Sequence, residues 1–419
     1  MARTLDVYLH QELVGRLTQG NDGQMVFEYL ESWLTNTRAT PLSHSLPLLQ
    51  KKFNRKECRG FFAGILPEES KREIIARNLG ISARNDFAML EQIGGECAGA
   101  VTFIPTGRPS PERNYSYRKL SAEELAGILR ELPRRPLLAG EDGIRLSLAG
   151  AQDKIAVRIE DGAVCLPLGG APSTHILKPA VERFEGVVFN EALCMKLASA
   201  VDLPAANVEI RNVDSKEYLL VERYDRVHQK GAAGEPVLER VHQEDFCQAQ
   251  GIVSEMKYQK EGGPSLKQCF ALLREVSSRP VVDLARFLDA VIFNYLAGNN
   301  DAHGKNYSLL YHGSGTSNLD IRLAPLYDIV STIYYPELSR EMAMKIGGEY
   351  SSEKVTPKNF EKLAEEAALG KALVRARVPE VAERVLAALP KIEIAHPVAE
   401  KVAALIRKRC EETRNRFGV

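Results

Sequence analysis

The order of hydrophobic patterns along this 419-residue chain is the feature that most limits how it can fold. LDVYLHQELVGRLTQ (5–19) alternates, which predicts a strand, a turn and a second strand. From Ile144 short strand-like segments dominate, and after Pro264 the pattern is helical to the end, except around the loop 299–306. Strands followed by helices are typical of α+β proteins. We therefore expect an α+β fold in three parts: an N-terminal α/β subdomain (1–110), a linker and strand-rich lobe (111–263), and an all-helical C-terminal lobe (264–419).

Charge and cysteine content exclude several classes of protein. Lys+Arg and Asp+Glu both number 55, which argues against a dominant nucleic-acid-binding surface. The seven cysteines are scattered and never spaced Cys-x-x-Cys, so we expect a reducing compartment and neither a disulfide framework nor a zinc site. The start, MARTLDVYLHQELVGRL, has no long apolar stretch, and no segment reaches the roughly 18 apolar residues of a membrane span. We expect a cytoplasmic protein that does not enter a membrane.

The loop NNDAHGKN (299–306) concentrates polar side chains between two apolar segments, and LAPLYDIVST (323–332) follows it. Asp301 and Asn306 are five residues apart, and Asp328 lies further along. Phosphoryl transfer from ATP needs a carboxylate base, together with an amide oxygen and a second carboxylate that hold Mg²⁺. Asp-x-x-x-x-Asn followed by a distant Asp is the spacing of protein kinases. The pattern predicts Asp301 as the catalytic base and Asn306 and Asp328 as Mg²⁺ ligands.

Two further residues of this loop fit the same chemistry. His303 follows the expected base, as in atypical and lipid kinases, and Lys305 is placed to neutralise the transferred phosphate. The alternative interpretation is a solvated loop whose Asp and Asn side chains cap helix ends. The apolar flanks argue against that alternative.

An upstream region supplies the groups that a kinase needs to bind ATP. Lys178, on the expected strand THILKPA, would hold the α- and β-phosphates, with Glu191 of the next helix as its partner. In YLLVERYDR, Glu222 and Tyr224 would face the adenine through their backbone, although the segment also suits a plain core strand. The glycines of GEDGIRLSLAGAQDK (140–154) suit a loop that covers phosphates.

Seven segments in one order resemble the HipA family, serine/threonine kinases that act as toxins of bacterial toxin–antitoxin pairs. They are LSLAGAQDKIAV, THILKPA, NEALCMKLA, LLVERYDR, HQEDFCQA, NNDAHGKN and LAPLYDIVST. VYLHQELVGRL, LSHSLPL and FFAGILPE resemble the N-terminal region of the family, so the likeness covers nearly the whole chain.

The resemblance implies a bilobal kinase-like fold that uses ATP and Mg²⁺. Ser147 would be the serine of a mobile phosphate loop that becomes autophosphorylated. The expected catalytic residues are Asp301, His303 and Lys305. The expected ATP-binding residues are Ser147, Ala149, Gly150, Ala151, Gln152, Lys154, Lys178, Glu222, Arg223, Tyr224, His303, Asn306, Tyr327 and Asp328.

The resemblance also implies partners. Family members phosphorylate glutamyl-tRNA synthetase, which halts translation and promotes growth arrest and persistence. A dimeric helix-turn-helix antitoxin, HipB, neutralises them and carries most of the contact with operator DNA.

Two other functions remain open. A nucleotide-binding corepressor with weak kinase activity would tolerate loss of the base, a metal ligand or the lysine, yet all of them are present. A metal-dependent hydrolase built on Asp301, His303 and Asp328 would need more converging ligands than this one Asp–His pair provides.

Overall fold

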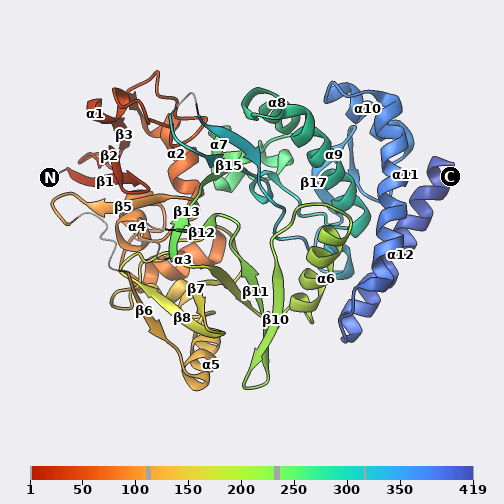
Figure 1. Ribbon diagram of the computed structural model, residues 1–419, viewed down its shortest axis with the longest axis horizontal. Helices are drawn as coiled ribbons and strands as arrows, with labels where there is room; N and C mark the ends of the chain where they lie inside the picture. The colour runs from red at the N-terminus through yellow and green to blue at the C-terminus, as the bar shows by residue number, and fades with distance from the viewer. Residues whose placement is uncertain (1, 110–114, 231–235, 316–317, 419) are drawn as a thin grey trace. The chain divides into compact units, whose positions relative to one another are not determined.

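A computed structural model describes residues 2–109, 115–230, 236–315 and 318–418 (Figure 1). The chain divides into two compact units, each built from three stretches of sequence. Unit 1 consists of Met1–Pro179, Arg211–Glu255 and Leu309–Asp320, and unit 2 of Ala180–Ile210, Met256–Ser308 and Ile321–Val419. The predicted boundary after residue 110 lies outside the described residues, and the division into three domains stays a prediction.

Unit 1 begins with an antiparallel sheet in the order β4-β3-β2-β1-β5. Leu5 of β1 pairs with Leu17 of β2, which confirms the strand, turn and strand predicted for 5–19. The strands are β1 (Arg3–Leu9), β2 (Glu12–Gln19), β3 (Met25–Tyr29), β4 (Lys52–Phe53) and β5 (Val101–Pro105). The helices of this region are α1 (Glu31–Leu34), α2 (Arg55–Gly64), α3 (Glu69–Asn78) and α4 (Asp86–Ile93).

A second sheet has the order β10-β11-β9-β7-β8-β6. Asp161 and Gly162 both have positive φ between β7 and β8, as a tight hairpin turn requires. The strands are β6 (Ser116–Lys119), β7 (Ile155–Glu160), β8 (Ala163–Leu168), β9 (His175–Pro179), β10 (Val208–Val213) and β11 (Lys216–Glu222). The remaining elements are α5 (Ala122–Glu131), η1 (Pro136–Leu138), β12 (Arg226–Lys230), β13 (Pro236–Arg240), β14 (His242–Asp245), α7 (Phe246–Ala249) and η2 (Ser254–Met256).

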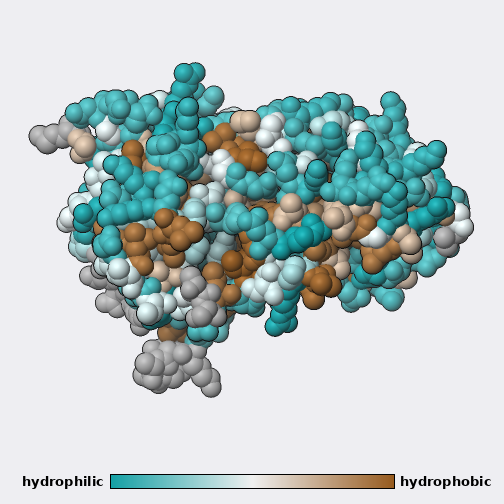
Figure 2. Space-filling view, turned by 90° about the horizontal axis from the view of Figure 1, so that it is seen from above, coloured by the Kyte–Doolittle hydropathy of each residue, from teal (hydrophilic) through white to brown (hydrophobic). Residues whose placement is uncertain are grey.

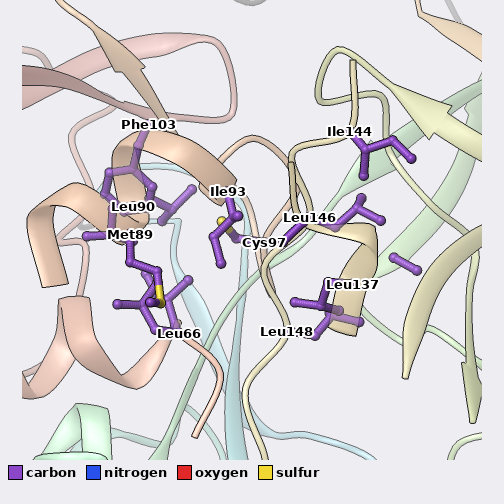
Figure 3. Close-up of a cluster of buried hydrophobic side chains, with 14 of the residues drawn as sticks. Leu66, Met89, Leu90, Ile93, Cys97, Phe103, Leu137, Ile144, Leu146 and Leu148 are labelled. Atoms are coloured by element: carbon purple, nitrogen blue, oxygen red, sulfur yellow. The ribbon is translucent and has the colours of Figure 1, made fainter. Parts of the chain in front are cut away.

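One hydrophobic core joins the two sheets of unit 1. In Figure 3, Ile93 and Cys97 lie between a group that includes Leu66, Met89, Leu90 and Phe103 and a second group that includes Leu137, Ile144, Leu146 and Leu148. Leu146 and Leu148 are the sequence neighbours of Ser147. The middle of the predicted phosphate loop (140–154) is therefore part of this core.

Unit 2 is mainly helical, with α9 and α12 packed against α11 (Figure 1). Its helices are α6 (Val187–Ala200), α8 (Leu266–Val276), α9 (Pro280–Ala297), α10 (Pro357–Glu366), α11 (Lys371–Ala388) and α12 (Pro397–Phe417), with the short helices η3 (Gln259–Glu261), η4 (Gly304–Asn306), η5 (Thr332–Tyr334) and η6 (Leu389–Lys391). The sequence from 264 onward also forms β15 (Ser308–His312), β16 (Asp320–Leu323), β17 (Glu341–Ile346) and β18 (Glu349–Ser351).

The α+β fold class is therefore confirmed, with one detail corrected, since the C-terminal part is not helical throughout. The segment EMAMKI of β17 contains good helix formers, which hides its strand character in the sequence. Gly347 and Gly348, with φ of 52° and 94°, form a tight turn that pairs β17 with β18.

No helix in the described ranges is both long and apolar enough to cross a membrane. Figure 2 shows hydrophilic residues over most of the visible face, with hydrophobic residues in smaller groups among them. All seven cysteines are buried free thiols. They therefore contribute as small apolar groups of the interior.

Candidate active site

The predicted catalytic loop begins where α9 ends, at Gly298. Its φ is +70°, and a Cβ at this position would lie 2.3 Å from the side chain of Ile333, so glycine is required. The side chain of Asn299 donates to Asn294 Oδ1 at 2.8 Å and accepts from the Asp301 N–H at 3.1 Å. Asn299 thus anchors the loop through its side chain, but neither bond caps a helix end, and the Asp301 carboxylate takes no part in this anchoring.

The carboxylate of Asp301 lies at an exposed position. Its Oδ1 accepts a hydrogen bond of 2.8 Å from the Tyr258 hydroxyl. The backbone oxygen of Asp301 accepts from the His303 N–H at 2.8 Å and from Asn306 Nδ2 at 3.0 Å. The backbone of Asp301 is therefore fixed within the loop, while its side chain reaches solvent, where a substrate hydroxyl can approach.

Asn306 is oriented by the same contacts. Its side-chain nitrogen Nδ2 donates to the Asp301 carbonyl, and its backbone N–H donates to the His303 carbonyl at 3.0 Å. This orientation directs the amide oxygen Oδ1 away from the bond to Asp301. An amide oxygen is one of the hard ligands that Mg²⁺ prefers, so Asn306 fits the predicted metal site.

Tyr327 ties the segment that carries Asp328 to the catalytic loop. Its hydroxyl donates to the Lys305 carbonyl at 2.7 Å and lies 2.7 Å from the hydroxyl of Ser308. Asp328 has φ of +58°, a left-handed conformation that is uncommon for a residue with a side chain. Unit 2 therefore brings Asp301, Asn306 and Asp328 onto two adjoining segments, and the amide and carboxylate oxygens suit Mg²⁺.

His303 and Lys305 lie inside the loop, each only 6% exposed. The ring of His303 meets the ring of Tyr258 edge-on, with centroids 5.4 Å apart. The Lys305 carbonyl accepts the Tyr327 hydroxyl, so the backbone of this lysine helps to hold the two segments together. Their catalytic roles stay predictions.

In unit 1, the strand register brings two lysines to the same end of β7 and β9. Ile155 of β7 pairs with Leu177 of β9 in antiparallel register. Lys154 and Lys178 are the next residues on either strand, so the register brings them to the same end. Lys178 is 6% exposed, and Lys154 Nζ donates to the Ala149 carbonyl at 2.8 Å. Two cations at the foot of a glycine-containing loop suit the binding of phosphates.

The second half of the predicted phosphate loop (140–154), from Ser147 onward, is docked on the N-terminal region of unit 1. Ser147 is fully buried, and its hydroxyl donates to the Ile65 carbonyl at 3.0 Å. The Glu68 N–H donates to the Gly150 carbonyl at 3.3 Å, and Lys71 forms an ion pair of 2.6 Å with Asp153. Between these anchors, Ala149, Gly150, Ala151 and Gln152 are partly exposed. In this position the Ser147 hydroxyl is inaccessible to phosphorylation, while residues 149–152 are accessible to a ligand.

The predicted hinge follows β11, whose last residue, Glu222, pairs with His175 of β9. The Arg223 N–H donates to the Thr174 carbonyl at 2.9 Å. Tyr224 is partly exposed and donates to Gln243 Oε1 at 2.6 Å. These bonds fix the backbone that would face adenine.

The Arg223 side chain belongs to a buried ionic network centred on Glu96. Glu96 accepts hydrogen bonds from Arg223 at 3.1 Å, from Arg226 at 2.8 Å and from Arg240 at 2.6 Å. Burial alone would raise the pKa of Glu96, but Arg226, Arg240 and Arg223 lower it to about 2. The side chain of Arg223 is thus engaged in holding the hinge, and a direct contact with ATP stays a prediction.

Sequence reasoning missed Glu96 and Tyr258. Glu96 lies 127 residues before Arg223, and Tyr258 lies 43 residues before Asp301. Neither stands in a motif, so no local signal marks them. Lys178 lies in unit 1 and Glu191 in unit 2, and their predicted pairing stays a prediction.

Two protein-family models together match most of the chain. The model of the HipA-like C-terminal domain matches residues 146–389, and that of the HipA N-terminal domain matches residues 5–104. The chain belongs to the HipA family. Both matches fall on segments quoted above for the resemblance, including the catalytic loop and the docked phosphate loop.

Relatives of this HipA family chain span nearly its whole length. A Sinorhizobium fredii protein named "Putative kinase Y4mE" is 45% identical over 396 residues, which cover 93% of this chain and 92% of the relative. The "Serine/threonine-protein kinase toxin HipA" of Shewanella oneidensis is 29% identical, covering 94% and 90%. A solved Shewanella oneidensis complex of HipA, HipB and operator DNA has a TM-score of 0.85 at 27% identity, covering 99% of this chain and 98% of that one.

Proposed function

We propose that this HipA family protein is a serine/threonine kinase toxin that transfers the γ-phosphate of ATP to a protein hydroxyl. The observation that carries the proposal is the bond from Tyr327 to the Lys305 carbonyl, which joins the Asp328 segment to the loop of Asp301 and Asn306. A base and two oxygen ligands on adjoining segments are the groups that phosphoryl transfer requires. The names of the relatives support the same activity.

In the proposed reaction the acceptor hydroxyl lies at the Asp301 carboxylate. Its oxygen attacks the γ-phosphorus, its proton passes to Asp301, the bond to the β–γ bridging oxygen breaks and ADP leaves. Asn306 Oδ1 and the Asp328 carboxylate would hold Mg²⁺, which neutralises phosphate charge when bound. Lys305, which belongs to the same loop as the base, would balance the charge on the transferred group.

The groups of unit 1 are proposed to hold the nucleotide. Lys178 and Lys154 would contact the phosphates, and the partly exposed backbone of 149–152 would cover them. The backbone of Glu222 and Tyr224 would contact adenine, with Arg223 fixed between them by the Glu96 network.

The proposed partners follow from the family. We propose that a HipB-like helix-turn-helix dimer binds and neutralises this chain and carries most of the contact with operator DNA. The similar Shewanella structure contains HipA, HipB and operator DNA, which supports the proposal. The proposed substrate is glutamyl-tRNA synthetase, whose phosphorylation would halt translation and promote growth arrest and persistence. Autophosphorylation would fall on Ser147.

The deciding experiment incubates the wild-type chain and Asp301→Asn with labelled ATP, Mg²⁺ and glutamyl-tRNA synthetase. We expect the variant to fold and bind ATP but to lose roughly 10²–10⁴ in transfer rate, the contribution of a general base. Asp320→Asn, which changes a partly exposed carboxylate that has no assigned role, is the control. ATP binding by the wild type without any labelled protein would favour the corepressor instead, and free phosphate would favour a hydrolase.

A further inference from the structure

The hydroxyl of Tyr258 is bonded to the proposed catalytic base. It donates to Asp301 Oδ1 at 2.8 Å, from a part of the chain 43 residues away. Both residues belong to unit 2. We propose that Tyr258 is a positioning residue for phosphoryl transfer: it holds the Asp301 carboxylate in the orientation that presents Oδ2 to the acceptor hydroxyl. This inference rests on the proposed kinase function.

The turn that carries Tyr258 has a fixed backbone. The carbonyl of Tyr258 accepts from the N–H groups of Glu261 and Gly263, both at 2.9 Å. A Cβ on Gly263 would lie 2.4 Å from the Met256 carbonyl oxygen, so only glycine allows the chain to close this tightly. The phenol therefore extends from a closed turn around η3.

This turn is also attached to the hairpin of β17 and β18. The side chain of Gln259 accepts from the Lys345 N–H at 2.9 Å, and Lys260 forms an ion pair with Glu341. The Tyr258 ring itself lies edge-on to His303, with centroids 5.4 Å apart, and Lys257 Nζ lies 5.4 Å from its centroid. The hydroxyl is thus placed by the turn, the hairpin and the catalytic loop together.

These bonds indicate that Tyr258 positions Asp301 and does not merely occupy the place of the acceptor hydroxyl until substrate arrives. A residue that merely occupied the place of the substrate hydroxyl would have to leave it in each cycle, and a segment held by this many bonds resists leaving. A fixed donor on Oδ1 instead restricts rotation of a carboxylate that is otherwise exposed. The tyrosine keeps its proton throughout, and the proton of the acceptor goes to Oδ2. A base held in one orientation reacts faster than one that samples several.

The test compares Tyr258→Phe with the wild type in steady-state phosphorylation of the substrate. Phe keeps the ring and its contact with His303 and removes only the hydroxyl. We expect kcat to fall about 10- to 100-fold, the cost of a misplaced reacting group, with an unchanged KM for ATP. Tyr350→Phe is the control: the Tyr350 ring lies beneath Lys260 of the same turn, at 4.8 Å, and we expect wild-type rates from it.

A double variant separates positioning from general loosening of the structure. Since Tyr258 acts only through Asp301, adding Tyr258→Phe to Asp301→Asn should cost nothing further, whereas a structural effect would reduce the rate again. If the wild type transfers no phosphate, the proposed function fails. If the wild type is active and Tyr258→Phe matches or exceeds its kcat, the kinase stands and the positioning role is overturned.

Discussion

At the scale of single residues, Asp328 combines unusual backbone geometry with proposed chemistry. A positive φ alone does not mark a functional residue, because Asp161 also has one and lies in the turn of the β7–β8 hairpin. Asp328 lies in no such hairpin; it follows Tyr327, whose hydroxyl is bonded to the catalytic loop. A left-handed conformation of a non-glycine residue costs about 1–3 kcal/mol and persists where the surroundings enforce it. That cost is understandable if the conformation directs the Asp328 carboxylate to a metal.

Asp328→Ala tests the metal role directly. Removing one hard oxygen ligand should weaken binding of Mg·ATP far more than binding of metal-free ATP, because only the former needs the carboxylate. Titration calorimetry with and without Mg²⁺ measures both affinities. Asp320→Ala should leave both unchanged. Equal losses of the two affinities in Asp328→Ala would show that this carboxylate does not hold the metal.

At the scale of elements, the docked position of the phosphate loop determines whether Ser147 can be phosphorylated. The hydroxyl is buried and bonded to the Ile65 carbonyl, so the loop must leave this position before Ser147 can receive phosphate. A phosphoserine carries about −1.5 to −2 charges at pH 7 and cannot return to a site between two core leucines. Phosphorylation would therefore keep the loop away from the ATP phosphates that it is proposed to cover.

Incubation with Mg·ATP should thus produce a Ser147-phosphorylated form with weakened ATP affinity. Mass spectrometry maps the site, and calorimetry compares the affinity before and after incubation. Ser147→Ala should keep its affinity through the same treatment. A phosphorylated form that binds ATP as well as the untreated chain would disprove the switch, as would an unmodified Ser147 in a chain that still labels its substrate.

The Glu96 network is the element that holds the hinge. Glu96→Gln leaves three buried arginines with less compensating charge, and we expect it to destabilise unit 1 by about 3–5 kcal/mol. The folded-state pKa of Glu96 is lowered from 4.5 to about 2, so its stabilising effect is present above pH 4.5 and is lost as pH falls toward 2. Thermal unfolding of the wild type between pH 4.5 and about 2 should show this loss of stability. Glu96→Gln should lose less stability over the same pH range. Matching pH dependence in both proteins would count against this account.

Local signals and long-range contacts explain which features could be predicted. The hairpin at 5–19 and the position of the loop 299–306 between two apolar elements could be predicted because alternation, turn residues and polar clusters lie within one segment. The catalytic roles in that loop stay predictions. Glu96 and Tyr258 were not, because their partners come from distant segments that only the fold brings together. The β17–β18 hairpin was missed because its residues favour helix locally, and its Gly347–Gly348 turn decides the structure.

At the scale of the whole molecule, equal numbers of acidic and basic residues bear on the proposed partners. With no net charge, the isolated chain should bind operator DNA weakly, since nonspecific DNA affinity comes mainly from cationic contacts with phosphates. We expect a tight complex with a dimeric helix-turn-helix protein, and DNA binding that depends on that partner. Mobility shifts of operator DNA over a salt series, with each protein alone and both together, measure this. Strong, salt-sensitive binding by the isolated chain would contradict it.

The interleaving of the two units in the sequence has a consequence during synthesis. Unit 1 takes its last stretch from Leu309–Asp320, and unit 2 continues to the final helix, α12. A ribosome that has made only the N-terminal half has therefore completed neither unit. Messages cut short, or ribosomes that stall midway, would release chains without a finished catalytic apparatus. A kinase with the proposed activity would therefore begin to act only after synthesis has passed the segments that complete both units.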